Sequence, residues 1–497
     1  MRATIVLALA LTAPLAGGVQ TDLPPAAMQE DFDVLRRAVE EAHGGLHRFT
    51  ARAELDKRFD AARARLTTPM SRLAYIGVLS EALAHVRDGH MQLEYDDATT
   101  AALGPARMLP LRVASEARAI VVTANDTPAN DTIRPGMELL SVNGRSIGDI
   151  SRLILPKLSG DGFIETGKAF RMARNFARLY WLFVDQSSTF AVTARTADGK
   201  AVTAQLDGVT SVARLESANP VNTAMNANVE KLDAPKDTVS LRFPQGDAVG
   251  VLRIRAFTGG TFQANVATAF TTLRRKGTKA LILDLRGNGG GVDMDGAALV
   301  SHFVNRPFRY FDHIKVTTVK PSFATWRPDT FDDLKAGTSP APDGGFLVLP
   351  RLHPGVAEQP PAAAPFLGRV FVLIDGGTFS TAADVCAQIR SLTKATFIGE
   401  ETGGGFEGNT SGLNAQIVLP RSGLRLRIQM YGYWNAVRGG QPGRGTLPDI
   451  TIVRRTADTL AGRDVALERA LLMAKSQSGT GESFTDSGQP SLSLWWD

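Results

Sequence analysis

Two segments of the chain place a glycine-rich turn between an apolar strand and a helix, a design that can support catalysis. The first is ALILDLRGNGGG (residues 280–291) and the second is VFVLIDGGTFSTAAD (residues 370–384). Their apolar runs do not alternate with polar residues, which is typical of strands covered on both faces. Ser380 falls where the second helix begins, beside backbone N–H groups that lack helical partners. This position suits a nucleophile whose attack creates an oxyanion.

Each segment also has an ordinary structural interpretation. Ser380 or Thr378 is a suitable N-cap for the helix, and the GNGGG turn could cradle a phosphate. The chain contains no GxxxxGK[ST], and the turn does not have GxGxxG spacing, so a nucleotide site is disfavoured. The glycines between residues 287 and 291 instead free the backbone to approach a substrate closely and to direct N–H groups at it.

The two segments occur together with FIGEETGGG, LPDI and, near the N-terminus, RDGHMQL (residues 87–93). This combination resembles the tail-specific or C-terminal processing serine peptidase family, which includes the tricorn core and the interphotoreceptor retinoid-binding proteins. The resemblance implies an α/β fold with a crotonase-like ββα core and a nucleophile at Ser380. It also implies an oxyanion hole built from the backbone N–H of Thr381 and that of Gly289 or Gly290, without a cofactor.

A serine hydroxyl needs a base to act as a nucleophile at neutral pH. In the bacterial processing branch that base is a lysine in a segment resembling G-x-x-T-x-G-K, but Gly405 stands at the lysine position here. In the tricorn-like branch it is a histidine in the segment matched by RDGH, which indicates His90 as general base, with His85 as the nearest competitor.

The chain departs from the family pattern in two places. Gly89 stands where the tricorn core has a serine, and GGQPGRG contains no carboxylate where the family has its orienting acid. The sequence therefore does not identify the residue that orients the His90 imidazole. The four candidates are Gln441, Glu401, Glu407 and Asp88.

The sequence gives little support for catalysis by a metal ion or by a cysteine thiol. There is no HExxH motif, so we expect no metal site. The histidines outside the RDGH region are expected to be structural: His43, His47, His302, His313 and His353. Cys386, the single cysteine, lies on the apolar face of the predicted helix after Ser380, where a buried inert thiol is expected.

The overall composition indicates a soluble protein of several domains that is exported. The chain has 497 residues and a net charge of +5, with basic residues scattered, which does not favour a nucleic-acid partner. Residues 1–20 combine Arg2, a short apolar run and small residues, as in a secretory signal peptide. We therefore expect a periplasmic or secreted protein with no stable membrane insertion after signal cleavage.

The segment from Pro135 to Ile147 combines a Pro-Gly turn, the strand ELLSV and an Asn-Gly hairpin, and it resembles a PDZ domain. An ordinary hairpin inside the main domain is the alternative. The predicted organisation is a signal peptide (1–20), a helical region ending in RDGH (21–100), a PDZ-like domain (101–160), a connecting helical and β segment (161–235), a peptidase core (236–475) and a flexible tail (476–497).

The leading hypothesis is an exported serine endopeptidase that cleaves unstructured or partly unfolded polypeptides, with Ser380 as nucleophile and His90 as base. One alternative is a non-catalytic ligand- or peptide-binding protein on the same fold, since a fold does not fix a function. A second is a hydrolase of small acyl compounds that also uses Ser380. The oligomeric state is not predicted.

Overall fold

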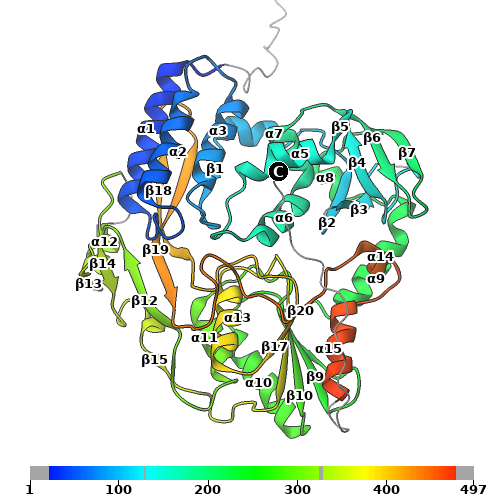
Figure 1. Ribbon diagram of the computed structural model, residues 1–497, viewed down its shortest axis with the longest axis vertical. Helices are drawn as coiled ribbons and strands as arrows, with labels where there is room; N and C mark the ends of the chain where they lie inside the picture. Colours follow the sequence, from blue (N-terminus) through cyan, green and yellow to red (C-terminus); the bar gives the residue numbers. More distant parts are fainter. Residues whose placement is uncertain (1–21, 118, 128–129, 324–327, 477–497) are drawn as a thin grey trace, which may run out of the picture.

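The computed structural model describes residues 22–476, apart from 118, 128–129 and 324–327. The predicted signal peptide and the tail beyond residue 476 lie outside the described residues. Three sheets of six strands organise the chain, and the predicted α/β class is confirmed (Figure 1). Among the described residues, no helix is long and apolar enough to cross a membrane.

The segment 236–475 is built on a largely parallel sheet with the order β20-β17-β16-β10-β9-β8. Its strands are β8 (Val239–Arg242), β9 (Val249–Ile254), β10 (Ala280–Asp284), β16 (Arg369–Ile374), β17 (Thr396–Gly399) and β20 (Ile450–Thr451). Only β8 runs antiparallel to its neighbour. Every residue of β10 is buried, because helices α10 (Phe262–Arg275), α11 (Asp293–Ser301) and α13 (Thr381–Leu392) pack on one face of the sheet and α15 (Val465–Ser476) on the other.

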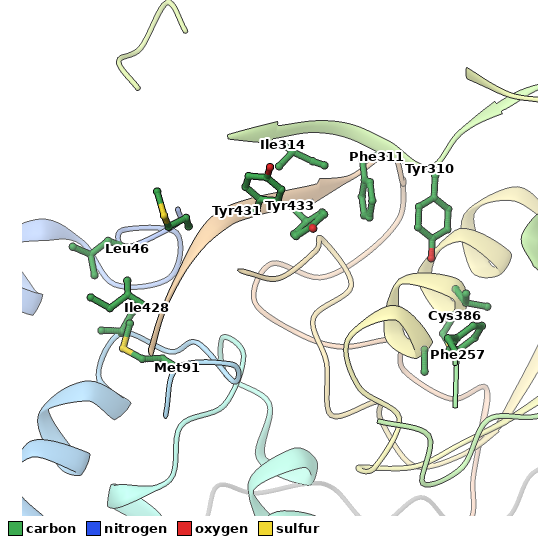
Figure 2. Packing of buried hydrophobic residues seen from close by; sticks show 14 of the residues in the cluster. Leu46, Met91, Phe257, Tyr310, Phe311, Ile314, Cys386, Ile428, Tyr431 and Tyr433 are labelled. Carbon is green, nitrogen blue, oxygen red and sulfur yellow. The ribbon is translucent and has the colours of Figure 1, made fainter. Parts of the chain in front are cut away.

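A second, antiparallel sheet joins the N-terminal helices to this core. It contains β1 (Gln92–Glu94), β12 (Phe311–Val316), β13 (Thr338–Pro340), β14 (Phe346–Val348), β18 (Thr410–Val418) and β19 (Arg425–Asn435). Helices α1 (Pro25–Ala42), α2 (Arg52–Ala64) and α3 (Arg72–Ala84) share one hydrophobic cluster with it. Figure 2 shows this cluster running from Leu46 and Met91, past Ile428 and Tyr433 of β19, to Cys386 of α13. The helical region 21–100 therefore has no core of its own.

The third sheet forms the β-rich unit and corrects one predicted boundary. It contains β2 (Leu111–Glu116), β3 (Ala119–Asn125), β4 (Glu138–Val142), β5 (Arg145–Ser146), β6 (Thr189–Arg195) and β7 (Ala201–Asp207). Because β6 pairs with β4, the unit extends past residue 160 into the segment that we expected to be a connector. Helices α5 (Ile147–Ile154), α6 (Glu165–Arg174) and α7 (Phe176–Phe183) complete its separate core.

The Asn-Gly hairpin of this unit is present as expected. Asn143 and Gly144 have φ values of 49° and 75°, which is the left-handed pair that a tight two-residue hairpin needs. Whether the unit is a PDZ domain stays a prediction. The remaining elements are α4 (Asp97–Leu103), η1 (Leu155–Lys157), α8 (Ser211–Leu215), η2 (Pro220–Asn222), α9 (Thr223–Asp233), β11 (Phe308–Arg309), α12 (Pro328–Ala336), η3 (Pro354–Val356), β15 (Glu358–Gln359) and α14 (Thr456–Leu460).

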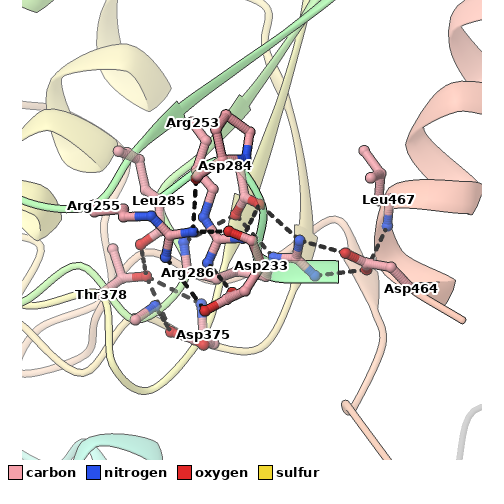
Figure 3. A network of polar contacts seen from close by, with 12 residues as sticks. Asp233, Arg253, Arg255, Asp284, Leu285, Arg286, Asp375, Thr378, Asp464 and Leu467 are labelled. Atoms are coloured by element: carbon pink, nitrogen blue, oxygen red, sulfur yellow. Dashed lines mark hydrogen bonds and ion pairs between the residues drawn. The ribbon is translucent and has the colours of Figure 1, made fainter. Parts of the chain in front are cut away.

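A buried polar network fixes the end of β10 to the last helix (Figure 3). Arg286 donates to Asp284 on one side, at 2.7 and 2.9 Å, and to Asp464 on the other, at 2.7 and 2.8 Å. Asp284 is 1% exposed, so its charge is retained only because the guanidinium compensates it. The network holds the strand from which the first glycine-rich turn begins.

Candidate active site

The two glycine-rich turns lie together because they follow adjacent parallel strands. β10 pairs with β16, so the chain leaves both strands at the same edge of the sheet. Asp375 Oδ1 then accepts hydrogen bonds from the amide of Gly287 at 2.8 Å and from that of Gly377 at 2.9 Å. Thr378 Oγ1 donates to the carbonyl of Leu285 at 3.0 Å, a contact drawn in Figure 3. One carboxylate and one hydroxyl therefore join the two turns.

Ser380 stands at the sharp corner between the second turn and α13. It is the N-cap of that helix, with φ 54° and ψ −133°, a region of backbone space that costs a non-glycine residue about 1–3 kcal/mol. Gly290 of the first turn lies directly against it: a Cβ at that position would be 2.6 Å from Ser380 Cβ and 2.9 Å from the Thr381 nitrogen. The strained corner presents the hydroxyl outward, as the sequence predicted.

His90 is the partner of this hydroxyl. Its Nε2 lies 3.0 Å from Ser380 Oγ, although 290 positions separate the two residues in the sequence. The pairing of β1 with β19 places the loop that carries His90, and Gln429 of β19 donates to its carbonyl at 2.8 Å. The imidazole packs on Phe379 with ring centroids 4.5 Å apart. Burial lowers the pKa of His90, so the ring is neutral near pH 7 and able to accept a proton.

Backbone N–H groups for an oxyanion lie on both sides of the serine. Within the described residues, the amides of Thr381 and Gly289 have no backbone or side-chain acceptor within hydrogen-bonding distance. The amide of Gly290 is different, because it donates to Asn288 Oδ1 at 2.9 Å. Of the two glycines left open by the sequence, Gly289 is therefore the one whose N–H is free to bind an oxyanion.

Comparison with known proteins fits this geometry. The sequence model of peptidase family S41 matches residues 248–452, which include both glycine-rich turns and Ser380. Residues 248–452 thus carry the sequence signature of a serine-type peptidase of family S41. The tail-specific peptidase resemblance read from the motifs is thus confirmed. No curated protein matches the chain.

Solved structures share the fold of this chain. Mature CPAF is 16% identical, with a TM-score of 0.62, over 91% of this chain and 97% of that one. A structure of mature CPAF complexed with lactacystin gives 15% identity and a TM-score of 0.63, over 91% and 98% of the two chains. Identities this low support the fold and nothing finer.

The second nitrogen of the His90 ring lies near two buried carboxylates. His90 Nδ1 is buried and makes no hydrogen bond with any described residue. Asp88 Oδ1 lies 4.0 Å from it, and donor atoms of Asp88, His90 and Asp161 are all within 4.8 Å of one another. Those distances are too long for direct hydrogen bonds but short enough for strong charge interactions in a buried site.

Asp88 carries a full negative charge at this site. Burial favours its neutral form, but the hydrogen bond from His43, assisted by that from Thr410, outweighs this effect and lowers the pKa of Asp88 to about 2. His43 Nε2 lies 2.7 Å from Asp88 Oδ2, while His43 Nδ1 accepts the amide of Gly45 at 3.1 Å. That pattern makes His43 a neutral donor, so it stabilises the carboxylate without cancelling its charge.

Asp161 belongs to the segment that we expected to be a connector, and the sequence analysis missed it. Its Oδ1 accepts the amide of Gly89 at 2.7 Å and its Oδ2 accepts that of Gly405 at 3.2 Å. Burial raises the pKa of Asp161, and the neighbouring His90 opposes that rise. Asp161 thus joins the RDGH turn to the turn in which a lysine would stand in the bacterial processing branch.

The same packing explains why Gly89 replaces the serine of the tricorn core. A Cβ at residue 89 would lie 2.8 Å from atoms of Asp161, Arg171 and Phe379. No room is left there for a side chain. The only sequence signal for Asp161 was its place in the polar segment SGDGF, which many surface turns share.

The other three candidates for orienting His90 are committed elsewhere or exposed. Glu401 pairs with Arg444 at 2.6 and 2.8 Å. Glu407 Oε2 accepts the amide of Gly443 at 3.4 Å, and Gln441 is exposed. The backbone carbonyl of His85, the competing base, accepts a hydrogen bond from Thr50 Oγ1 at 2.8 Å. His85 is not among the residues that line the cleft at Ser380.

Ser380 and His90 open into a cleft of about 480 Å³. Its other lining residues include Asp293, Met294 and His353. His353 follows strands β13 and β14, which extend the antiparallel sheet. Cys386 is buried as expected, and burial raises the pKa of its thiol.

The carboxylates beside His90 do not form a convincing metal site. Asp88, His90 and Asp161 are the one group among the described residues whose donor atoms are close enough to share a cation. Both Asp88 oxygens already accept hydrogen bonds, from the His90 amide and from His43 and Thr410. These residues are better understood as the surroundings of the histidine.

Proposed function

We propose that this S41 peptidase is an exported endopeptidase that cleaves unstructured or partly unfolded polypeptides through an acyl-enzyme on Ser380. The observation that carries the proposal is the 3.0 Å contact between Ser380 Oγ and His90 Nε2 beside two free backbone amides. Nucleophile, base and oxyanion donors are the complete set that acyl transfer requires.

In the first half of the reaction, Ser380 Oγ attacks the scissile carbonyl carbon while His90 Nε2 takes the hydroxyl proton. The carbonyl oxygen becomes an oxyanion that accepts hydrogen bonds from the amides of Thr381 and Gly289. His90 then gives its proton to the departing amine, which leaves an ester on Ser380. In the second half, His90 takes a proton from water, the hydroxide attacks the ester, and the proton returns to Ser380.

The negative charges of Asp88 and Asp161 stabilise the imidazolium that forms in each half. They act over 4–5 Å, through charge and by holding the RDGH turn, because neither makes a hydrogen bond with Nδ1. This arrangement takes the place of the orienting acid that the family carries and this chain lacks. Asp161 and Asp88 are therefore positioning residues.

A polypeptide substrate fits the cleft and the neighbouring unit. A cleft of about 480 Å³ admits a few residues of an extended chain but no folded domain. The β-rich unit, if it is a PDZ domain, would add the substrate chain end to its sheet. Export follows from residues 1–20, and periplasm and medium are both open to such a protein.

The test compares the mature protein with Ser380→Ala and His90→Ala on a reduced and alkylated protein substrate, with products followed by mass spectrometry. Ser391→Ala is the matched control, because Ser391 lies at the far end of α13 and caps the amide of Arg438. We expect cleavage to be lost in the first two variants and kept in the control. A fluorophosphonate probe should label the native protein but not Ser380→Ala.

The outcomes separate the alternatives. Cleavage of short esters without cleavage of peptides would support a small-acyl hydrolase, and no cleavage or labelling at all would support a binding protein. Cleavage that survives Ser380→Ala would refute the proposed nucleophile. For export, a fusion of residues 1–20 to a reporter should deliver it across the inner membrane of a bacterial host, and a cytoplasmic, uncleaved fusion would contradict the assignment.

A further inference from the structure

The cleft beside Ser380 contains one carboxylate that the proposed mechanism does not use. Asp293 opens helix α11 directly after the first glycine-rich turn, and its side chain is 20% exposed. Among the residues that line the cleft, it is the only one with a fixed charge, and none is Lys or Arg. The charge of Asp293 also reaches the catalytic base, since it raises the pKa of His90 against the effect of burial.

The protein groups that donate to Asp293, among them the hydroxyl of Tyr433, are neutral and do not cancel its charge. Thr381 Oγ1 lies 3.2 Å from Asp293 Oδ1 but also donates to the carbonyl of Gly291 at 2.9 Å, so its single proton is shared. His353 Nε2 lies 3.2 Å from Asp293 Oδ2. In the described chain, His353 is the only ion-pair partner that Asp293 has.

His353 does not neutralise this carboxylate. Its Nδ1 accepts the amide of Gly355 at 3.2 Å, so that nitrogen carries a lone pair and the ring proton is on Nε2. The neutral ring is held in place by Phe311, at a centroid distance of 5.6 Å, and by Tyr433, at 5.7 Å. Figure 2 shows these two aromatic residues side by side above the core helix that carries Cys386.

The position of Asp293 suits a negative charge that attracts a cation. It lies in the first turn of α11, where the positive end of the helix dipole favours an anion. An anion in a concave, partly desolvated site attracts a cation more strongly than one on an open surface does. The cleft lining also contains apolar residues, among them Met294 and the exposed Val292, which suit the methylene stem of a long side chain.

We propose that Asp293 is a specificity-determining residue that selects polypeptides carrying a lysine or arginine next to the scissile bond. The cationic head contacts the Asp293 carboxylate and the aliphatic stem packs along Met294 and Val292. This inference rests on the proposed peptidase function and adds the substrate class to it. Acidic side chains at the same substrate position are disfavoured, because they would meet the carboxylate without a counter-charge.

The test uses a set of unstructured peptides of one sequence in which Lys, norleucine or Glu is moved through each position near the cleavage point. Norleucine has the stem of lysine without its charge. We expect one position at which kcat/KM for Lys exceeds that for norleucine by about tenfold or more. In Asp293→Asn that ratio should fall to near one, and the Glu peptide should improve relative to the other two.

A matched control is Asp295→Asn, because Asp295 lies in the same helical turn but bonds Gln263 outside the cleft. Its Lys to norleucine ratio should equal that of the native protein. A purely structural role of Asp293 would lower kcat/KM for every peptide equally and leave the ratio unchanged. A native ratio near one, or a ratio that survives Asp293→Asn, overturns the inference.

The same peptides also separate this inference from the proposed function. If no peptide is cleaved and the fluorophosphonate does not label Ser380, the peptidase proposal fails by itself. Binding of the Lys and norleucine peptides to the Ser380→Ala protein, measured by fluorescence anisotropy, then decides the inference. Tighter binding of the Lys peptide that disappears with Asp293→Asn supports it, and equal binding overturns it.

Discussion

Asp161→Asn changes one atom in the surroundings of His90, the proposed general base. The amide side chain keeps an oxygen that can accept the Gly89 amide, so the RDGH turn retains its 2.7 Å contact, whereas the 3.2 Å contact with the Gly405 amide is lost. What disappears is the negative charge within 4.8 Å of a donor atom of His90. The substitution therefore tests the charge more than the fold.

The size of the effect follows from this distance. At an effective dielectric constant of about 20, two unit charges about 4.8 Å apart attract by about 3.5 kcal/mol. Relaxation and water penetration around a buried pair of charges reduce this attraction, so roughly 1–3 kcal/mol is the appropriate range. Since each 1.4 kcal/mol is worth about tenfold in rate, kcat/KM at pH 7 should fall by about 10- to 100-fold.

The assay is the pH dependence of kcat/KM on an unfolded substrate. Asp161 raises the pKa of His90, so its neutralisation should move the acid limb of the profile to lower pH while it lowers the plateau. Asp198→Asn, in the exposed β6–β7 hairpin, should change neither. A loss of rate with an unmoved acid limb would mean that Asp161 only holds the turn, and native kinetics in the variant would refute its role altogether.

Three further predictions follow from the site. Because burial lowers the pKa of His90, kcat/KM of the native protein should fall on acidification with an apparent pKa below 6.5, and a midpoint above 6.5 would exclude His90 as the titrating base. Gly290→Ala should reduce activity at least 100-fold, since its Cβ would lie 2.6 Å from Ser380 Cβ. Gly259 has a similar positive φ, but a Cβ there would meet open space, so Gly259→Ala is the control. Activity assays of both variants separate the effect of the clash from that of backbone strain. Burial raises the pKa of Asp384 of α13 to about 8, so the native state loses stability as the pH rises from about 4 to 8. In urea titrations, Asp384→Asn should raise the free energy of unfolding on the order of a few kcal/mol at pH 8 and leave it unchanged near pH 3. An equal rise at both pH values would contradict this.

The sequence was sufficient wherever a local pattern fixed the outcome. Apolar runs followed by glycines predicted the buried parallel strands β10 and β16, since only residues covered on both faces dispense with alternation. Asn143-Gly144 predicted its hairpin because few other pairs adopt positive φ twice in succession. The strand-turn-helix order placed Ser380 at the N-cap of α13, and the RDGH motif indicated His90.

Only the tertiary structure could supply the rest, because the deciding contacts join residues that are far apart in the chain. Asp161 comes from a turn with no regular pattern, and its importance depends on packing against Gly89 and Gly405. The choice of Gly289 over Gly290 depends on where one side chain, Asn288, directs its oxygen. Local propensities determine which elements form, whereas a catalytic site depends on distances across the folded chain, and those are set by strand pairing and packing.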